Sequence, residues 1–483
     1  MNKESLTFKA GVLAAANASQ KLTMLISAMI LSRYLPVSAY GSYQQLIVIY
    51  GTLLVVVAFG LPQSINYFLP RSESPGEKKA YVVQTYFLLL GLSVIFTSIL
   101  FLGSKFISNH FNNEELSELL KLFAFFVFFL IPIQFVDQLL VVLNKTKKLA
   151  VYRISFACLR LLAIIVPVSM KASLKTIVGF LVGFSLIQFA VTTFILFKPF
   201  MKIKFSWRRT FLGQQLRYST YIGMSSFVGV LNRESDKIIV SLFFIPASFA
   251  VYANGARELP FIGIITGSVI AILVPEFVKL YQEKKVQELL TLWHLSIGKV
   301  AVVLFPIAAF LFLFAREFMV TLFSLKYLAS TKVFMIYLLL VPLRVTTYGA
   351  ILMSVGKTQI IFKSAAYALL LNILLNIMFI KVFGPIGPAI ATVLVTYVLT
   401  TYLLCRIKQE LRVPFGSVMP WRKLAKLMTI CVLPLAFIVP VKLSSLSFYS
   451  KLFTAGIVYF SIYALIIIKL KEFPISDQNA RAT

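Results

Sequence analysis

Residues that build metal or redox sites are scarce in this chain of 483 residues, which holds three cysteines and two histidines. Cys158, Cys405 and Cys431 stand alone within or at the ends of apolar runs, and His110 and His294 are far apart. Neither residue type has partners at ligand spacing, so the sequence indicates no disulfide framework and no metal centre. We expect no cofactor.

Acidic residues are also few, 17 against 47 Lys and Arg, and the formal net charge is +30. The sequence shows no pair of carboxylates, no nucleophile elbow and no polar segment long enough for a soluble catalytic domain, so we expect no enzyme. The basic residues form short clusters between apolar runs rather than one tail or one helix face. This pattern is typical of membrane topology, and we expect no nucleic-acid partner.

What the chain does contain is apolar sequence: 59% of its residues are hydrophobic and its mean hydropathy is +0.89. Repeated apolar runs of about 20 residues predict an all-α polytopic membrane protein. The first run is too long for a cleavable signal peptide, so we expect it to be retained. We count about fourteen transmembrane helices, at 11–35, 43–69, 80–103, 119–143, 149–170, 174–197, 218–244, 250–278, 291–315, 330–355, 360–381, 386–405, 424–441 and 449–470.

The basic residues in the loops indicate an orientation. If the N-terminus lies inside and the spans alternate, most loop Lys and Arg fall on the inner side. This bias follows the positive-inside rule and predicts that both termini are cytoplasmic.

Charged residues inside the predicted spans are the most informative feature. Residues 233–237 place four charges in five positions of one span, and Arg257 and Glu258 follow in the next. Such charges are costly in hydrocarbon unless they face protein or water, so they indicate a functional interior. The basic residues within spans are Lys21, Arg160, Arg233, Lys237, Arg257, Lys299 and Arg344, and the acidic ones are Asp137, Glu234, Asp236 and Glu258. This interior is therefore net positive.

Structural interpretations stand beside the functional one. Arg233 and Asp236, like Glu234 and Lys237, are three residues apart and could pair within one helix.

A salt bridge between the spans at 218–244 and 250–278 is an alternative for Arg257 and Glu258. Lys21 and Lys299 could snorkel, with the aliphatic part of the side chain in the membrane and the amine at the membrane–water interface. Asp137 is a candidate proton or sodium site, with an interhelical hydrogen bond as the alternative.

An internal repeat organises the chain. Residues 35–43 read LPVSAYGSY and residues 245–252 read IPASFAVY, so Pro, Ser and the final Tyr recur. Because six spans separate the copies, the repeat predicts two six-helix lobes of the same orientation. The predicted parts are a first lobe (1–198), a basic cytoplasmic linker (199–217), a second lobe (218–406) and two further spans with a tail (407–483).

At this point the chain resembles a known family. The pieces are AYGSY at 39–43, FGL at 59–61 with FLPR at 68–71, RESDKIIV at 233–240 with Tyr252-Ala253, Gly356-Lys357, Asn372 and Asn376, and FGPIGPAIAT at 383–392. In order and spacing they are similar to the polysaccharide flippases of the multidrug/oligosaccharidyl-lipid/polysaccharide exporter superfamily, the Wzx-type O-antigen and capsule exporters. Pro388 stands where that family usually has a small residue.

The resemblance implies a two-lobed, MATE-like transporter in the bacterial inner membrane. It would move a polyprenyl-diphosphate-linked oligosaccharide outward by alternating access, driven by an H⁺ or Na⁺ gradient, with polysaccharide polymerase machinery as a partner. Arg and Lys can replace the hydration of the diphosphate. We therefore expect a substrate-binding cationic cavity formed by Arg233, Lys237, Arg257, Arg344, Arg160 and Lys21. The candidates for ion coupling or charge pairing are Asp137, Glu234, Asp236 and Glu258.

Three other functions remain open from the sequence. A lipid II flippase would need the same chemistry for a different headgroup. A drug/cation antiporter of the same superfamily would call for an acidic interior, and a membrane glycan polymerase or ligase for a large outer loop. The basic interior disfavours the antiporter and the short outer loops disfavour the enzyme, while the lipid II flippase stays open beside the oligosaccharide flippase.

Overall fold

The computed structural model of the protein describes residues 6–204 and 210–470. Within these ranges all regular elements are helices and no strand occurs, which confirms the predicted all-α class. The chain divides into two compact units, unit 1 ending at Ala250 and unit 2 beginning at Val251. The predicted lobes, with a linker at 199–217, stay a prediction, and residues 205–209 of that linker lie outside the described residues.

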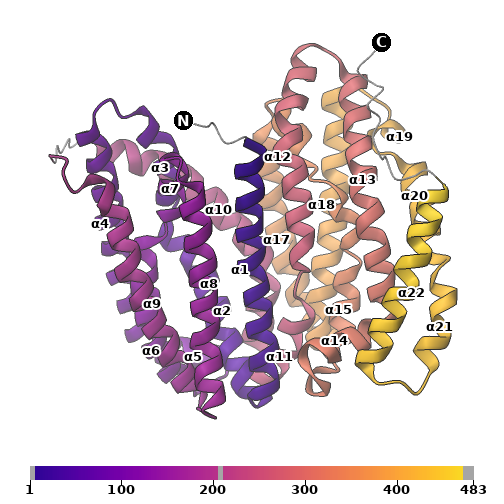
Figure 1. The fold of residues 1–483 in the computed structure, drawn as a ribbon, viewed down its shortest axis with the longest axis horizontal. Coiled ribbons are helices and arrows are strands. Elements are labelled where there is room, and N and C mark those ends of the chain that lie inside the picture. The colour runs from indigo at the N-terminus through magenta and orange to yellow at the C-terminus, as the bar shows by residue number, and fades with distance from the viewer. Residues whose placement is uncertain (1–5, 205–209, 471–483) are drawn as a thin grey trace. The chain divides into compact units, whose positions relative to one another are not determined.

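Unit 1 contains the helices up to α10 and the start of α11, labelled in Figure 1. In it α1 packs along α8, α6 lies between α4 and α9, and α10 packs on α2 and α3. The elements are α1 (Leu6–Tyr34), α2 (Val37–Ala58), α3 (Leu61–Arg71), α4 (Pro75–Leu102), α5 (Ser104–His110), α6 (Leu116–Leu130), η1 (Ile131–Ile133), α7 (Val136–Val142), α8 (Thr146–Ser169), α9 (Leu174–Phe197), η2 (Lys198–Phe200), α10 (Thr210–Phe243) and α11 (Pro246–Gly255).

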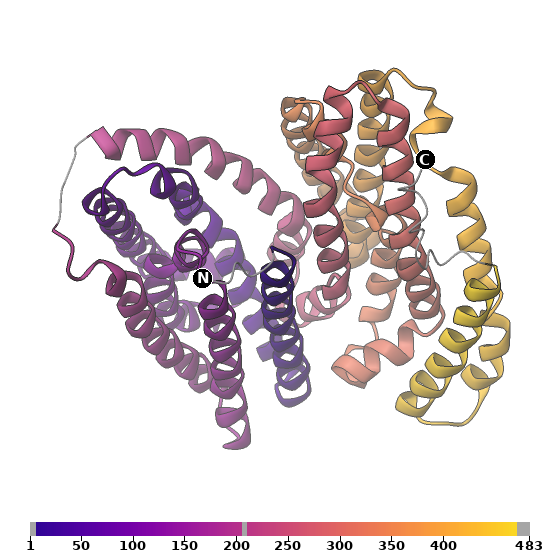
Figure 2. The ribbon, with the colours of Figure 1, turned by 45° about the horizontal axis from the view of Figure 1, so that its top comes forward.

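Unit 2 runs from the end of α11 to the C-terminal helices. Its α17 and α18 pack side by side, and α21 and α22 form a hairpin, drawn in yellow in Figures 1 and 2. The elements are α12 (Pro260–Gln282), α13 (Val286–Leu313), α14 (Ala315–Phe323), η3 (Leu325–Tyr327), α15 (Ser330–Leu338), η4 (Val341–Val345), α16 (Gly349–Ser354), α17 (Thr358–Phe383), η5 (Gly384–Ile386), α18 (Gly387–Leu411), α19 (Phe415–Val418), α20 (Trp421–Val432), α21 (Leu435–Leu443) and α22 (Phe448–Lys469).

Many of these helices are long and apolar enough to cross a membrane. Among the described residues nine helical segments meet that standard, and a bent pair, Ser330–Leu338 with Val341–Ser354, would make ten. One of the nine, Thr358–Leu411, contains both α17 and α18. The protein is therefore a multi-pass membrane protein, while the exact count of fourteen spans and the cytoplasmic position of both termini stay predictions.

Serine side chains begin three of the long helices. Ser74 Oγ accepts from Glu77 N at 3.2 Å at the start of α4, and Ser173 and Ser447 do the same for α9 and α22. The first backbone N–H groups of a helix have no partner inside it, so each serine satisfies one of these donors. The loop sequences thus fix where these helices begin.

A glycine contact joins α10 to the break between α2 and α3. Phe59 and Gly60 both have left-handed backbone conformations, with φ of 42° and 74°, and they end α2 and start α3. A Cβ built on Gly60 would overlap the carbonyl oxygen of Ser219, and one on Gly223 would lie 2.7 Å from the carbonyl carbon of Phe59. Backbone therefore packs on backbone here, which only glycine permits.

One side chain of α10, Gln215, adds a polar junction and is fully buried. Its Nε2 donates to Ser64 Oγ at 2.8 Å and to Thr85 Oγ1 at 2.7 Å. Its Oε1 accepts from Gln84 Nε2 at 2.7 Å. Since a buried amide is costly without partners, this satisfied network fixes α10 against α3 and α4.

Each copy of the repeat motif begins a helix near its proline. Pro36 is the N-cap of α2, and Pro246 is the first residue of α11. A Cβ on Gly41 would overlap the backbone carbonyl of Pro246, so the first copy packs directly on the start of the second.

The glycine contact can be tested within α10 itself. We expect Gly223→Ala to lower the stability of the folded protein by about 1–3 kcal/mol, since the added methyl group must displace backbone. Gly213→Ala is the matched control, because nothing lies within 4 Å of its Cβ position. Apparent melting temperature of the purified protein measures both. Equal melting temperatures for the two variants would contradict the contact.

Candidate functional site

The charged stretch of α10 contains one ion pair and one exposed cation. Lys237 Nζ lies 2.8 Å from Glu234 Oε2, and both side chains are largely covered. Asp236 is 1% exposed. Arg233 is exposed and forms no ion pair with the described part of the chain, so the alternative pairing of Arg233 with Asp236 does not occur. Of the two predicted cations on this helix, only Lys237 forms an ion pair among the described residues.

Arg257 and Glu258 lie at a break rather than within a helix. The apolar run at 250–278 predicts one continuous span, but the chain leaves α11 at Gly255 and begins α12 at Pro260. The predicted continuous span is therefore interrupted where Arg257 lies. Breaks of this kind occur in membrane proteins where backbone is buried in protein or lines a cavity.

Arg344 stands at a second break, in the 3₁₀ helix η4, where the two halves of its span are bent by 43°. Its Nε lies 3.0 Å from Glu258 Oε1, so an ion pair connects the two broken segments. The side chains remain 43% and 54% exposed. Glu258 thus pairs with Arg344, a pairing that the sequence did not suggest.

One hydrogen-bond donor at this junction has no acceptor among the described residues. It is the buried Nε of Arg257, whereas Arg344 Nε faces Glu258 Oε1 in the ion pair. Arg257 also has no ion-pair partner among the described residues. Buried donors of this kind are normally paired, so the junction has capacity for an additional acceptor.

Arg160 belongs to a different site, a cavity of about 370 Å³ inside unit 1. Asp137, Tyr152 and Gln188 line the same cavity. Asp137 forms an ion pair with Arg153, with Nη2 and Oδ2 2.6 Å apart, and Arg153 also donates to Asn17. The carboxylate of Asp137 is therefore already paired with Arg153, whereas Arg160 forms no ion pair in the described residues.

The predicted site residues thus fall into separate groups. The structure brings together Arg344 with Glu258, Lys237 with Glu234, and Arg160 with Asp137 around one cavity. Lys21 is exposed and is not among the residues that line that cavity. Their roles in substrate binding and ion coupling stay predictions.

Sequence reasoning missed two features. The breaks at 256–259 and 341–345 have a signal in Pro260 and Pro342, but proline alone does not separate a kinked helix from a broken one. A cavity rich in tyrosine at the junction of α3, α4 and α10 was not expected, because its residues come from three segments.

Solved structures with the same architecture include several transporters. The chain matches the lipid II flippase MurJ in an inward closed conformation with a TM-score of 0.74 and 16% identity, over 95% of this chain and 99% of that one. It matches an inward-facing multidrug resistance MATE transporter of the MOP superfamily with a TM-score of 0.63 and 16% identity, over 83% and 99% of the two chains.

A MOP superfamily transporter from Pyrococcus furiosus, described as having a binding pocket of reverse polarity, gives a TM-score of 0.53 at 15% identity, over 84% of this chain and 95% of that one. At these identities the likeness shows the fold, which is of the MurJ and MATE type, as the resemblance implies.

No curated protein sequence matches the chain. Residues 30–332 match the family described as Polysaccharide biosynthesis protein, which is well over half of the sequence. The chain therefore belongs to this family of polysaccharide biosynthesis proteins.

Proposed function

We propose that the protein is a flippase for polyprenyl-diphosphate-linked oligosaccharide repeat units in the bacterial inner membrane. It would carry them outward by alternating access, coupled to an H⁺ or Na⁺ gradient, for synthesis of O-antigen, capsule or exopolysaccharide. Membership of the polysaccharide biosynthesis family and a fold shared with the lipid II flippase MurJ support this proposal. No catalytic residue is assigned.

The observation that carries the proposal is the state of Arg257. Its Nε is buried without a hydrogen-bond acceptor, and it sits at a helix break beside the Glu258–Arg344 pair. Two guanidinium groups against one carboxylate leave one positive charge. A diphosphate supplies the missing acceptors and the opposite charge, and Arg can bind its oxygens through two parallel N–H groups.

The remaining predicted residues take supporting roles in the proposal. Arg233 is an exposed cation on α10, and Lys237 is paired with Glu234. Arg160 offers a further cation in the cavity of unit 1. For ion coupling, Asp236 is the most deeply buried of the four acidic candidates, with 1% of its surface exposed.

A lipid II flippase is the second candidate, favoured by the similarity to MurJ over 95% of this chain. Its cargo would use the same diphosphate site. A drug/cation antiporter is disfavoured, because a cationic cargo would meet an uncompensated guanidinium at the helix breaks.

Deletion of the gene tests the proposal directly. We expect complete lipid-linked repeat units to accumulate on the cytoplasmic leaflet and surface polysaccharide to be lost, because the unflipped carrier cannot reach the polymerase. Lipid extraction and sugar analysis identify the headgroup and separate the two flippase candidates. Normal levels of such intermediates would favour the drug/cation exporter, and single units on the outer leaflet would favour an enzyme that acts after flipping.

Single arginine substitutions test the cationic site. We expect Arg233→Ala, Arg257→Ala and Arg344→Ala each to reduce export about tenfold or more, since one charge-assisted hydrogen bond contributes about 1.5–3 kcal/mol. Membrane insertion should be unchanged. Lys175→Ala is the control, because Lys175 is a largely exposed cation paired with Glu118. Full export by all three variants would show that the cationic site is wrong.

Glu258 should compete with the cargo for Arg344. We expect Glu258→Gln to tighten binding of extracted lipid-linked saccharide to the protein in nanodiscs several-fold, while stability changes by about 1 kcal/mol or less because the pair is half exposed. Glu283→Gln, which removes the carboxylate of a loop ion pair with Lys285, is the matched control and should leave binding unchanged. Weaker binding by Glu258→Gln would mean that Glu258 positions Arg344 rather than competing for it.

A further inference from the structure

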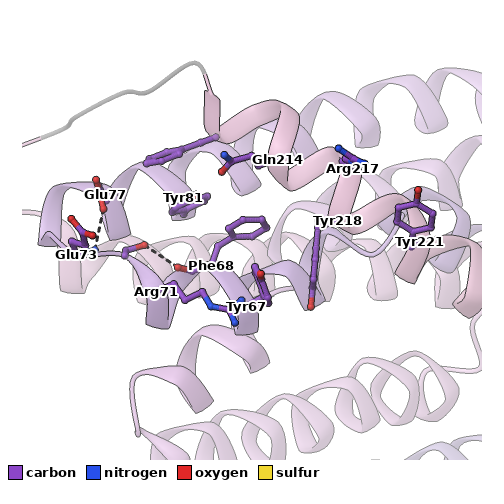
Figure 3. Close-up of a pocket in the computed structure, with 12 residues that line it drawn as sticks. Tyr67, Phe68, Arg71, Glu73, Glu77, Tyr81, Gln214, Arg217, Tyr218 and Tyr221 are labelled. Atoms are coloured by element: carbon purple, nitrogen blue, oxygen red, sulfur yellow. Dashed lines mark hydrogen bonds between the residues drawn. The ribbon is translucent and has the colours of Figure 1, made fainter. Parts of the chain in front are cut away.

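A cavity of about 660 Å³ lies in unit 1 where α3 ends and α4 and α10 begin (Figure 3). It is separate from every residue that the sequence predicted for the site. Its volume falls within the range of about 300–1,000 Å³ that is usual for small-molecule sites. Six aromatic side chains line it: Tyr67, Phe68, Tyr81, Phe211, Tyr218 and Tyr221.

The inner part of this aromatic lining is structural. Tyr81 stacks on Phe211 with ring centroids 4.4 Å apart and on Phe68 at 5.2 Å. Tyr81 and Phe211 are buried. Rings packed in this way join α3, α4 and α10, and they lie close to the Gln215 junction that holds the same three helices. The walls of the cavity are therefore firmly held.

The outer part offers aromatic surface that nothing in the described residues covers. Tyr67 stacks on Tyr218 with centroids 4.5 Å apart, and the guanidinium of Arg71 lies 3.6 Å from the centroid of the Tyr67 ring. Tyr67 is still 39% exposed, and Tyr221, one turn beyond Tyr218, is 70% exposed. Figure 3 shows Tyr67, Tyr218 and Arg71 gathered at one side of the cavity.

The charges of the cavity balance. Arg71 and Arg217 face the same space as Glu73 and Glu77. Glu77 is buried, and its carboxylate accepts from the backbone N of Glu73 at 3.0 Å, so it is fixed in place. A lone anion would meet two carboxylates and a hydrocarbon tail would meet four charges, so neither suits the lining.

We infer that this cavity binds the saccharide portion of the cargo, an uncharged polyhydroxylated ligand. Tyrosine faces pack on the C–H faces of sugar rings, while guanidinium, carboxylate and amide groups exchange hydrogen bonds with hydroxyls. The inference rests on the proposed function for its choice of ligand. In the predicted topology the cavity opens on the cytoplasmic side, where lipid-linked saccharides are assembled, and it would hold the headgroup before translocation.

Saturation-transfer NMR on the full-length protein in nanodiscs tests the inference. The probe is the mixture of saccharides released by mild acid from the total polyprenyl-linked lipids of the native host, which exists whatever this protein transports. We expect saturation to pass from aromatic protons of the protein to sugar protons. Inorganic diphosphate, added as a competitor, should leave that signal unchanged.

Paired variants locate the binding to this cavity. We expect the double variant Tyr67→Ala with Tyr221→Ala to weaken saccharide binding about tenfold, since it removes the exposed aromatic faces. Tyr221→Phe keeps the ring and should bind within about twofold of the original protein. Tyr367→Ala is the matched control, because Tyr367 in α17 is 68% exposed and lies outside this cavity. Apparent melting temperatures verify that every variant is folded.

The outcomes separate this inference from the proposed function. Absence of saccharide binding, binding unaffected by the double variant, or displacement of the probe by diphosphate would each overturn the inference. None of these results concerns accumulation of lipid-linked units after gene deletion, which tests the flippase proposal alone. Conversely, saccharide binding at this cavity without such accumulation would sustain the inference and reject the flippase proposal.

Discussion

The close approach of α10 to the break between α2 and α3 is the constraint on which unit 1 depends. Gly223 and Gly60 allow backbone to touch backbone, and Gln215 closes the remaining gap with three hydrogen bonds. One end of α10 is thereby fixed beside α3 and α4, where the aromatic cavity forms. Arg233 and its charged neighbours lie further along the same helix. The contacts that determine where the charged residues of α10 lie within unit 1 are thus made by uncharged groups.

Helix breaks organise the charges of unit 2. A regular helix satisfies its own backbone hydrogen bonds and offers no partner to an arginine side chain, whose charge is costly at membrane depth. At 256–259 and 341–345 the backbone leaves that pattern, and Arg257, Glu258 and Arg344 occur at these places. The ion pair neutralises part of the charge. The buried Nε of Arg257 finds no acceptor in the part of the chain that the structure describes.

The sequence predicted the all-α class and the multi-pass character, because hydropathy depends only on local composition. The type of fold followed from the family resemblance. It also identified the charged residues, since a charge in an apolar run is visible without coordinates. It could not predict which charges pair, because Glu258 and Arg344 are far apart in sequence and meet only through packing. The cavity lined by Tyr67, Tyr81 and Tyr218 was not predicted for the same reason. Tyrosine is common in this chain, and only the fold shows which tyrosines line a cavity and which pack in the interior.

The contact between Gly41 and Pro246 links the two copies of the repeat motif. Position 41 has no room for a side chain as long as the second copy begins its helix with Pro246 at that place. A larger residue at 41 would need a shift of the chain near 246, and a shift near 246 would open a void at 41. The two copies of the repeat motif are therefore not free to change independently at positions 41 and 246.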